Sequence, residues 1–116
     1  MIRNNFLAMP LHQEKIHDGD GECGHCTLFD ASAFQTPIGF INYTVLPVGA
    51  SFGLHTHGND NEVYVILEGC GLYTADKEEA KVTTGDVLVN RPYGSHSLRN
   101  TGDIPLRVLV MEVHKP

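Results

Sequence analysis

Short apolar stretches separated by turn residues run through most of the sequence. Several are rich in β-branched and aromatic residues or alternate between apolar and polar positions, as half-buried strands do. Glycine, proline, asparagine or aspartate interrupts them about every 8–12 residues, a spacing typical of sandwiches and barrels. The predicted strands cover residues 26–29, 39–46, 51–57, 62–67, 71–75, 78–81, 87–90, 95–99 and 106–113. The pattern therefore predicts a small all-β barrel, with at most one helical turn at residues 30–33.

Alternation along a strand also predicts which side chains face the interior. Side chains two apart point to the same face, so Tyr64 and Ile66 accompany Glu62 if Glu62 points inward. By the same argument, Leu98 accompanies His96. Tyr64 is then a candidate for contact with a bound ligand through its hydroxyl, and a core aromatic with a satisfied hydroxyl is an equally good interpretation.

The last strand has two possible inward faces. One carries Leu106, Val108 and Val110, and the other carries Arg107 with its neighbours two apart. Burying an arginine without a partner is costly. We therefore expect the three aliphatic residues inside.

Composition limits the protein to one domain of an ordinary globular kind. The chain has 116 residues, 41% of them hydrophobic and 19% charged. Its net charge of −6 argues against nucleic acid or an anionic membrane as a partner. No apolar run has the length of a membrane span or a signal peptide, so we expect a cytoplasmic protein.

The N-terminal segment differs from the rest. Residues 1–16 contain scattered apolar side chains without a sustained period, and Pro10 prevents a helix through them. We expect residues 1–35 to be an arm and loop that pack on the barrel, and residues 36–116 to be the barrel domain. Residues 17–24, rich in glycine and acidic residues, read as a solvated loop. Apolar side chains on so short an arm need cover, which favours a homodimer.

The three cysteines do not suggest a disulfide framework. An odd number without a secretory signal is typical of free thiols. Cys23 and Cys26 form a CxxC pair, but the second half of a zinc-finger pattern is absent. We therefore expect no second metal site there, and a structural role for Cys70.

The segment from Gly49 to Gly69 carries the strongest chemical signal. His55 and His57 lie two apart on a predicted strand, so their imidazoles converge on one point. A Gly-Asn-Asp-Asn turn follows, and it allows the chain to fold back and present Glu62 on the next strand. Two neutral imidazoles and a carboxylate form a site for a divalent transition metal.

These residues resemble the first motif of the cupin superfamily. The pattern G-x5-H-x-H-x(3,4)-E-x6-G is matched by Gly49, His55, His57, Glu62 and Gly69. Residues 85–100 resemble the second motif, G-x5-P-x-G-x2-H-x3-N, through Gly85, His96 and Asn100. Pro92 and Gly94 lie one residue closer to His96 than that pattern has them. The motifs and their spacer cover residues 38–114.

The resemblance implies a double-stranded β-helix, or jelly roll, with His55, His57, Glu62 and His96 as metal ligands. It also implies dimerisation, which is common among cupins. Four ligands on a six-coordinate ion leave two positions for water, substrate or dioxygen. A histidine-rich set suits iron, manganese, nickel, cobalt, copper or zinc without selecting one. The other histidines (His12, His17, His25 and His114) lie outside both motifs and are expected at the surface.

Three classes of function fit this sequence. The first is a metal-dependent enzyme acting on a small organic molecule, with a dioxygenase-like oxidation ahead of an isomerase or lyase and with Glu62 and Tyr64 as candidate catalytic residues. The second is a non-catalytic module that binds or senses a small molecule such as a sugar. The third is a structural protein of the stress or storage type, in which a metal only braces the barrel.

Overall fold

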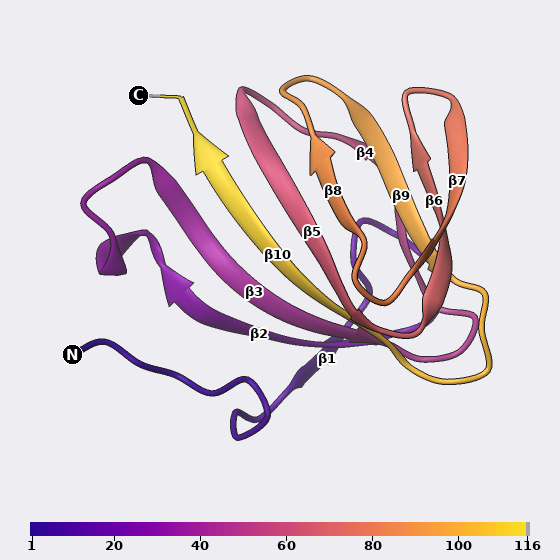
Figure 1. Ribbon diagram of the computed structural model, residues 1–116, viewed down its shortest axis with the longest axis horizontal. Coiled ribbons are helices and arrows are strands. Elements are labelled where there is room, and N and C mark those ends of the chain that lie inside the picture. The colour runs from indigo at the N-terminus through magenta and orange to yellow at the C-terminus, as the bar shows by residue number, and fades with distance from the viewer. Residues whose placement is uncertain (116) are drawn as a thin grey trace.

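The computed structural model describes residues 1–115 and has two antiparallel sheets (Figure 1). The larger sheet has the order β1-β2-β3-β10-β5-β8 and the smaller one the order β4-β9-β6-β7. The strands of the larger sheet are β1 His12–Glu14, β2 Cys23–Asp30, β3 Ile38–Leu46, β10 Leu106–His114, β5 Asp60–Glu68 and β8 Val87–Asn90. Those of the smaller sheet are β4 Ser51–Thr56, β9 Ser95–Asn100, β6 Cys70–Ala75 and β7 Glu78–Thr83. The predicted all-β jelly roll is confirmed.

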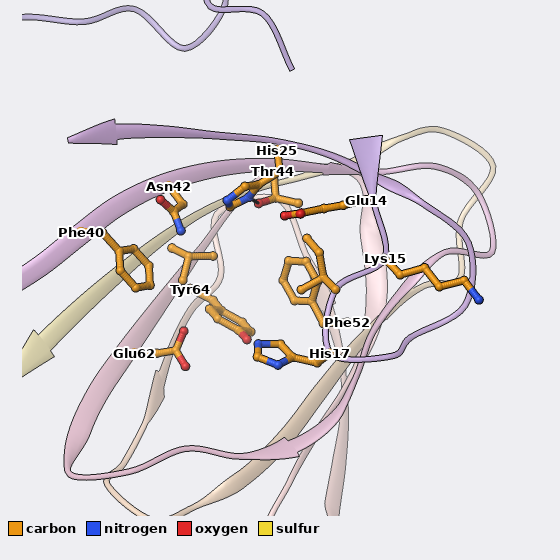
Figure 2. Close-up of a pocket in the computed structure, with 12 residues that line it drawn as sticks. Glu14, Lys15, His17, His25, Phe40, Asn42, Thr44, Phe52, Glu62 and Tyr64 are labelled. Carbon is orange, nitrogen blue, oxygen red and sulfur yellow. Dashed lines mark hydrogen bonds between the residues drawn. The ribbon is translucent and has the colours of Figure 1, made fainter. Parts of the chain in front are cut away.

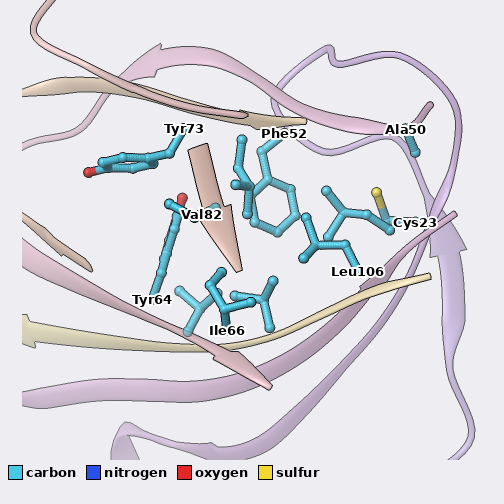
Figure 3. Packing of buried hydrophobic residues seen from close by; sticks show 12 residues of the cluster. Cys23, Ala50, Phe52, Tyr64, Ile66, Tyr73, Val82 and Leu106 are labelled. Carbon is cyan, nitrogen blue, oxygen red and sulfur yellow. The ribbon is translucent and has the colours of Figure 1, made fainter. Parts of the chain in front are cut away.

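The main core lies between the two sheets and contains the side chains predicted to face inward. Tyr64 and Ile66 on β5, both labelled in Figure 3, and Leu98 on β9 are at most 2% exposed. On β10 the aliphatic set is inside: Leu106, Val108 and Val110 are all buried. Arg107 points to the outer face, where its guanidinium donates to the Tyr43 hydroxyl (2.6 Å) and contacts the Glu68 carboxylate (3.2 Å).

A second, smaller cluster covers the outer face of the larger sheet. Cys26, Leu28 and Tyr43 form its buried centre. Phe6 and Met9 of the N-terminal segment pack against them, so part of the arm is covered by its own chain. Ile2 and Leu7 remain exposed.

The region expected to be a loop before β2 is partly strand. β2 begins at Cys23, three residues earlier than predicted, and pairs with both β1 and β3. Cys23 belongs to the core between the sheets and Cys26 to the outer cluster, because an odd separation on a strand sends side chains to opposite faces. Their thiols therefore cannot converge on one ion. The expected helical turn is a 3-10 turn, η1 Ala31–Ala33.

The β6–β7 hairpin turns where predicted. Asp76 and Lys77 both have positive φ (48° and 73°), as the two central residues of a type I′ hairpin turn require. Within residues 1–115, no helix is long and apolar enough to cross a membrane.

Candidate metal centre

Two adjacent strands of the smaller sheet position the three histidines. His55 on β4 lies directly opposite His96 on β9, and their ring centroids are 4.1 Å apart. His57 follows the last residue of β4, with its ring centroid 4.9 Å from that of His96. The HxH spacing and the cross-strand pairing therefore direct the three imidazoles to one place.

Glu62 reaches this place from the other sheet. The turn after His57 does not make a hairpin, because β4 and β5 belong to different sheets, and the chain crosses from one layer to the other. The Glu62 carboxylate then lies 3.8 Å from the Nε2 atom of His96. The structure thus brings together all four side chains that the sequence singled out.

The orientation of the imidazoles fits a metal. The Nδ1–H of His55 donates to the carbonyl oxygen of Gly53 (2.8 Å), and that of His57 donates to the Asp60 carboxylate (3.1 Å). These bonds leave both Nε2 atoms with a free lone pair, in the way that hydrogen bonds hold histidine ligands of metals. Within residues 1–115, the Nε2 atoms of His55 and His57 and both ring nitrogens of His96 are buried without a hydrogen-bond partner. Buried polar atoms of this kind require a partner, and a cation supplies one.

Asp60 is a part of the site that sequence reasoning missed. It is buried (6% exposed), and its carboxylate lies near both His57 and Glu62. Two overlapping groups have ligand atoms within 4.8 Å of one another: His55, Glu62 and His96, and His57, Asp60 and Glu62. The sequence could have indicated this role, because His57 and Asp60 lie three residues apart across a tight turn.

The electrostatics of the site favour neutral imidazoles. Burial, reinforced by His55 and His57, lowers the pKa of His96 to about 3, and burial also lowers the pKa of His55. Burial raises the pKa of Glu62 to about 7. The imidazoles of His55 and His96 are therefore in the state that binds metals at neutral pH, and a bound cation would hold Glu62 ionised.

The second motif braces the site from two sides. The turn at residues 91–94 contains Tyr93 in a left-handed conformation (φ 60°), and its backbone N–H donates to the Gly58 carbonyl oxygen (2.9 Å). The Asn100 side-chain amide donates to the carbonyl oxygens of Leu46 (2.9 Å) and Ile104 (2.8 Å). These contacts fix both ends of β9 and hence the position of His96.

His17 is exposed, as expected for a histidine outside the motifs, but it also lies beside the site, which sequence reasoning missed. Its ring stacks on that of His55, with a centroid distance of 3.5 Å and an interplanar angle of 11°. The segment that carries it lies directly against β4: the Gly53 N–H donates to the Ile16 carbonyl oxygen (3.1 Å). A Cβ at Gly53 would overlap the His17 carbonyl oxygen, and a Cβ at Gly19 would overlap that of Ser51. Gly19 and Gly53 were therefore the features of the sequence that could have indicated this close approach of the two segments.

Two hollows meet at Glu62. One, of about 380 Å³, is lined by His55, His57 and Asp60. The other, of about 320 Å³, extends between the sheets past Tyr64 (Figure 2). Glu62, His17 and Phe40 line both.

Tyr64 forms part of the wall of the second hollow. It is 2% exposed, and its ring packs edge-on against His96 at a centroid distance of 5.5 Å. Burial, with the nearby Glu62 carboxylate, raises the pKa of Tyr64 well above its ordinary value. Its hydroxyl therefore keeps its proton at neutral pH and is a hydrogen-bond donor rather than a base.

Comparisons with known proteins agree with this geometry. Residues 42–112 match the model of the cupin domain family. The chain is 30% identical over 111 residues to an oxalate-binding protein of Thermotoga maritima, and the alignment covers 96% of this chain and 92% of that protein. It is also 42% identical over 65 residues to an uncharacterized protein of Methanocaldococcus jannaschii, where it spans about half of that protein (52%) and 56% of this chain.

Solved structures of other proteins share this fold. A predicted oxalate decarboxylase from Thermotoga maritima superposes with a TM-score of 0.92 at 27% identity, covering 96% of this chain and 97% of that one. The cupin domain of Schizosaccharomyces pombe Cnp3 superposes with a TM-score of 0.83 at 14% identity, covering 98% of this chain and 74% of that one. The second comparison bears on the fold alone.

Proposed function

Because the chain belongs to the cupin family, we propose that it binds one divalent transition metal through His55, His57, Glu62 and His96, and binds a small chelating acid of the oxalate type at that metal. The observation that carries the proposal is the set of buried imidazole nitrogens without partners: His55 and His57 line a hollow together with Glu62, and His96 lies 3.8 Å from the Glu62 carboxylate. The oxalate-binding relative supports the class of ligand.

The surrounding residues have distinct roles in this proposal. A bound divalent metal supplies Lewis acidity that attracts the carboxylate oxygens of a ligand. The Gly53 carbonyl oxygen and the Asp60 carboxylate accept hydrogen bonds from the Nδ1–H groups of His55 and His57, respectively, and so hold both rings in the binding orientation. Tyr64 offers a hydroxyl donor beside the site, and Phe40 adds apolar surface to its wall. The four ligand side chains do not identify the metal.

The test is metal content followed by ligand binding. Protein purified without a chelator should contain about one equivalent of a divalent metal by elemental analysis. A His55→Ala, His57→Ala double variant should lose it, and a His12→Ala variant, altered at an exposed histidine outside the site, should keep it. Oxalate should bind the loaded protein in calorimetry and not bind protein stripped of metal. Full metal content in the double variant would contradict the proposal.

A catalytic role is the second candidate, and the likeness to a predicted oxalate decarboxylase favours it. Glu62 and Tyr64 would then be the catalytic residues, with Tyr64 as a proton donor. This candidate predicts that the loaded protein consumes its ligand and that Tyr64→Phe slows consumption more than it weakens binding. If the ligand is recovered unchanged and Glu62→Gln alters affinity alone, the binding function holds by itself.

The homodimer also stays a prediction. The described residues leave apolar side chains exposed on the edge strand β8, at Val87 (60%) and Val89 (59%). An unpaired edge of this kind is a site where a second chain can pair. Light scattering at micromolar concentration should give twice the mass of the chain, and the mass of a monomer would refute it.

A further inference from the structure

The hollow past Tyr64 is larger than an oxalate ion requires. Its volume is about 320 Å³. An apolar cavity of about 150 Å³ in another protein holds benzene, which has as many non-hydrogen atoms as oxalate. Even if a ligand of the size of oxalate, bound at the metal, occupied part of this hollow, room would remain for a second group of about the same size.

The register of the strands shows where that room lies. Val110 on β10 pairs with Asn42 on one side and Tyr64 on the other, and these three residues form one row across the larger sheet. Glu62 lies in the next row, two residues further along the strands, which corresponds to about 7 Å. The hollow thus extends one full repeat of the sheet beyond the candidate metal ligand.

The far wall of the hollow combines apolar surface with uncharged polar groups and one carboxylate, and the one lysine among its lining residues turns away from it (Figure 2). Phe40, Phe52 and Val110 supply apolar surface. In Figure 2 the Glu14 carboxylate turns toward His25 and the Lys15 ammonium turns away from the hollow. A second carboxylate on the ligand would therefore meet a negative charge there and no positive one.

Asn42 provides a specific polar contact on this wall. Within residues 1–115, its Oδ1 atom is buried without a hydrogen-bond partner, and in Figure 2 its amide nitrogen turns toward the hollow. A half-turn of the amide exchanges its acceptor for its donor at the same point. A ligand hydroxyl, which both donates and accepts, satisfies either orientation.

We propose that the hollow is a subsite for the tail of a chelating acid, and that this tail is an uncharged ring with a hydroxyl group that bonds to Asn42. The inference rests on the proposed binding of an acid at the metal. It separates this chain from a protein built for oxalate alone, because a ligand of that size leaves Asn42 and the apolar wall without contact.

Four 2-oxo acids with the same chelating head test the subsite by calorimetry on the metal-loaded protein. Pyruvate has the head alone, phenylpyruvate adds a ring, 4-hydroxyphenylpyruvate adds the hydroxyl, and 2-oxoglutarate adds a charged tail. We expect phenylpyruvate to bind at least about tenfold more tightly than pyruvate because its ring is buried. The hydroxyl should add about fivefold through one hydrogen bond, and 2-oxoglutarate should bind no more tightly than pyruvate.

An Asn42→Leu variant isolates the polar contact. It should lose the fivefold gain of the hydroxyl and leave the affinity for phenylpyruvate and oxalate within about twofold. Equal affinity of the parent protein for all four acids would overturn the subsite, and this comparison does not depend on whether the variant folds. Unchanged discrimination by the variant would overturn the role of Asn42. Failure of oxalate and of every 2-oxo acid to bind the loaded protein would instead refute the proposed function.

Discussion

Replacing His96 with leucine should stabilise the metal-free protein. The imidazole is 1% exposed, and neither ring nitrogen has a hydrogen-bond partner; the nearest carboxylate oxygen, on Glu62, lies 3.8 Å away. A buried polar group without a partner costs about 1–3 kcal/mol, whereas leucine has a similar volume and no polar atom. We expect a gain of about 2 kcal/mol in the free energy of unfolding, or about 6–10 °C in Tm for a chain of this size.

Metal should reverse this order. A ligand present at 1,000 times its Kd stabilises the folded state by about 4 kcal/mol, and only the parent protein retains the full ligand set. The assay is urea and thermal unfolding followed by circular dichroism, once with a chelator and once with added metal. A His12→Leu variant, at an exposed position, should stay within about 0.5 kcal/mol of the parent in both. If His96→Leu destabilises the stripped protein, the imidazole nitrogens are satisfied without metal and the reasoning fails.

Three further outcomes are expected. Without metal, the free energy of unfolding measured in urea should fall as the pH drops from about 6.5 to about 3. In this window the unfolded chain takes up a proton at His96, whereas in the folded state the pKa of His96 is lowered to about 3 and the proton does not bind. Glu62, with its pKa raised to about 7, acts in the opposite sense between pH 4.5 and 7, so the loss should be steepest below pH 4.5 and a uniform slope would contradict this assignment. Gly53→Ala should destabilise the protein by about 1–3 kcal/mol in urea unfolding because its Cβ overlaps the His17 carbonyl oxygen, whereas Gly58→Ala, which meets open space, should be nearly neutral; equal effects would remove the close approach from the explanation. A Cys23→Ala, Cys26→Ala variant should contain as much metal as the parent, and a deficit of one equivalent in elemental analysis would show a second site.

Local periodicity predicted the strands and their inward faces well. Alternation is a property of neighbouring residues, so Tyr64, Ile66 and Leu98 could be placed inside before any pairing was known. The cost of burying Arg107 chose the face of β10 for the same reason. The spacing of His55, His57 and Glu62 and the turn between them predicted that these three converge, but His96 joined the set only through the motif resemblance, because alternation does not say which strands face one another across two sheets.

The features that periodicity missed depend on long-range approach. His17 sits on a segment without regular alternation, and it reaches His55 because Gly19 and Gly53 allow two backbones to touch. Asn42 was part of a predicted strand, but its place on the wall of the hollow follows from the pairing of β3 with β10 and of β10 with β5. Such contacts link residues far apart in sequence, and the local pattern of one sequence says little about which distant residues meet.

The division of the proposed ligands between two layers also sets the order of events during synthesis. His55, His57 and Glu62 leave the ribosome well before His96, which follows only after β6, β7 and β8. The set is complete only when β9 has paired with β4 against the layer that holds Glu62. Loading with metal is then a late step, open to a chain that has already closed its sandwich. A cobalt(II) ion, whose visible spectrum depends on its coordination, would therefore report on the docking of the two layers as the protein matures.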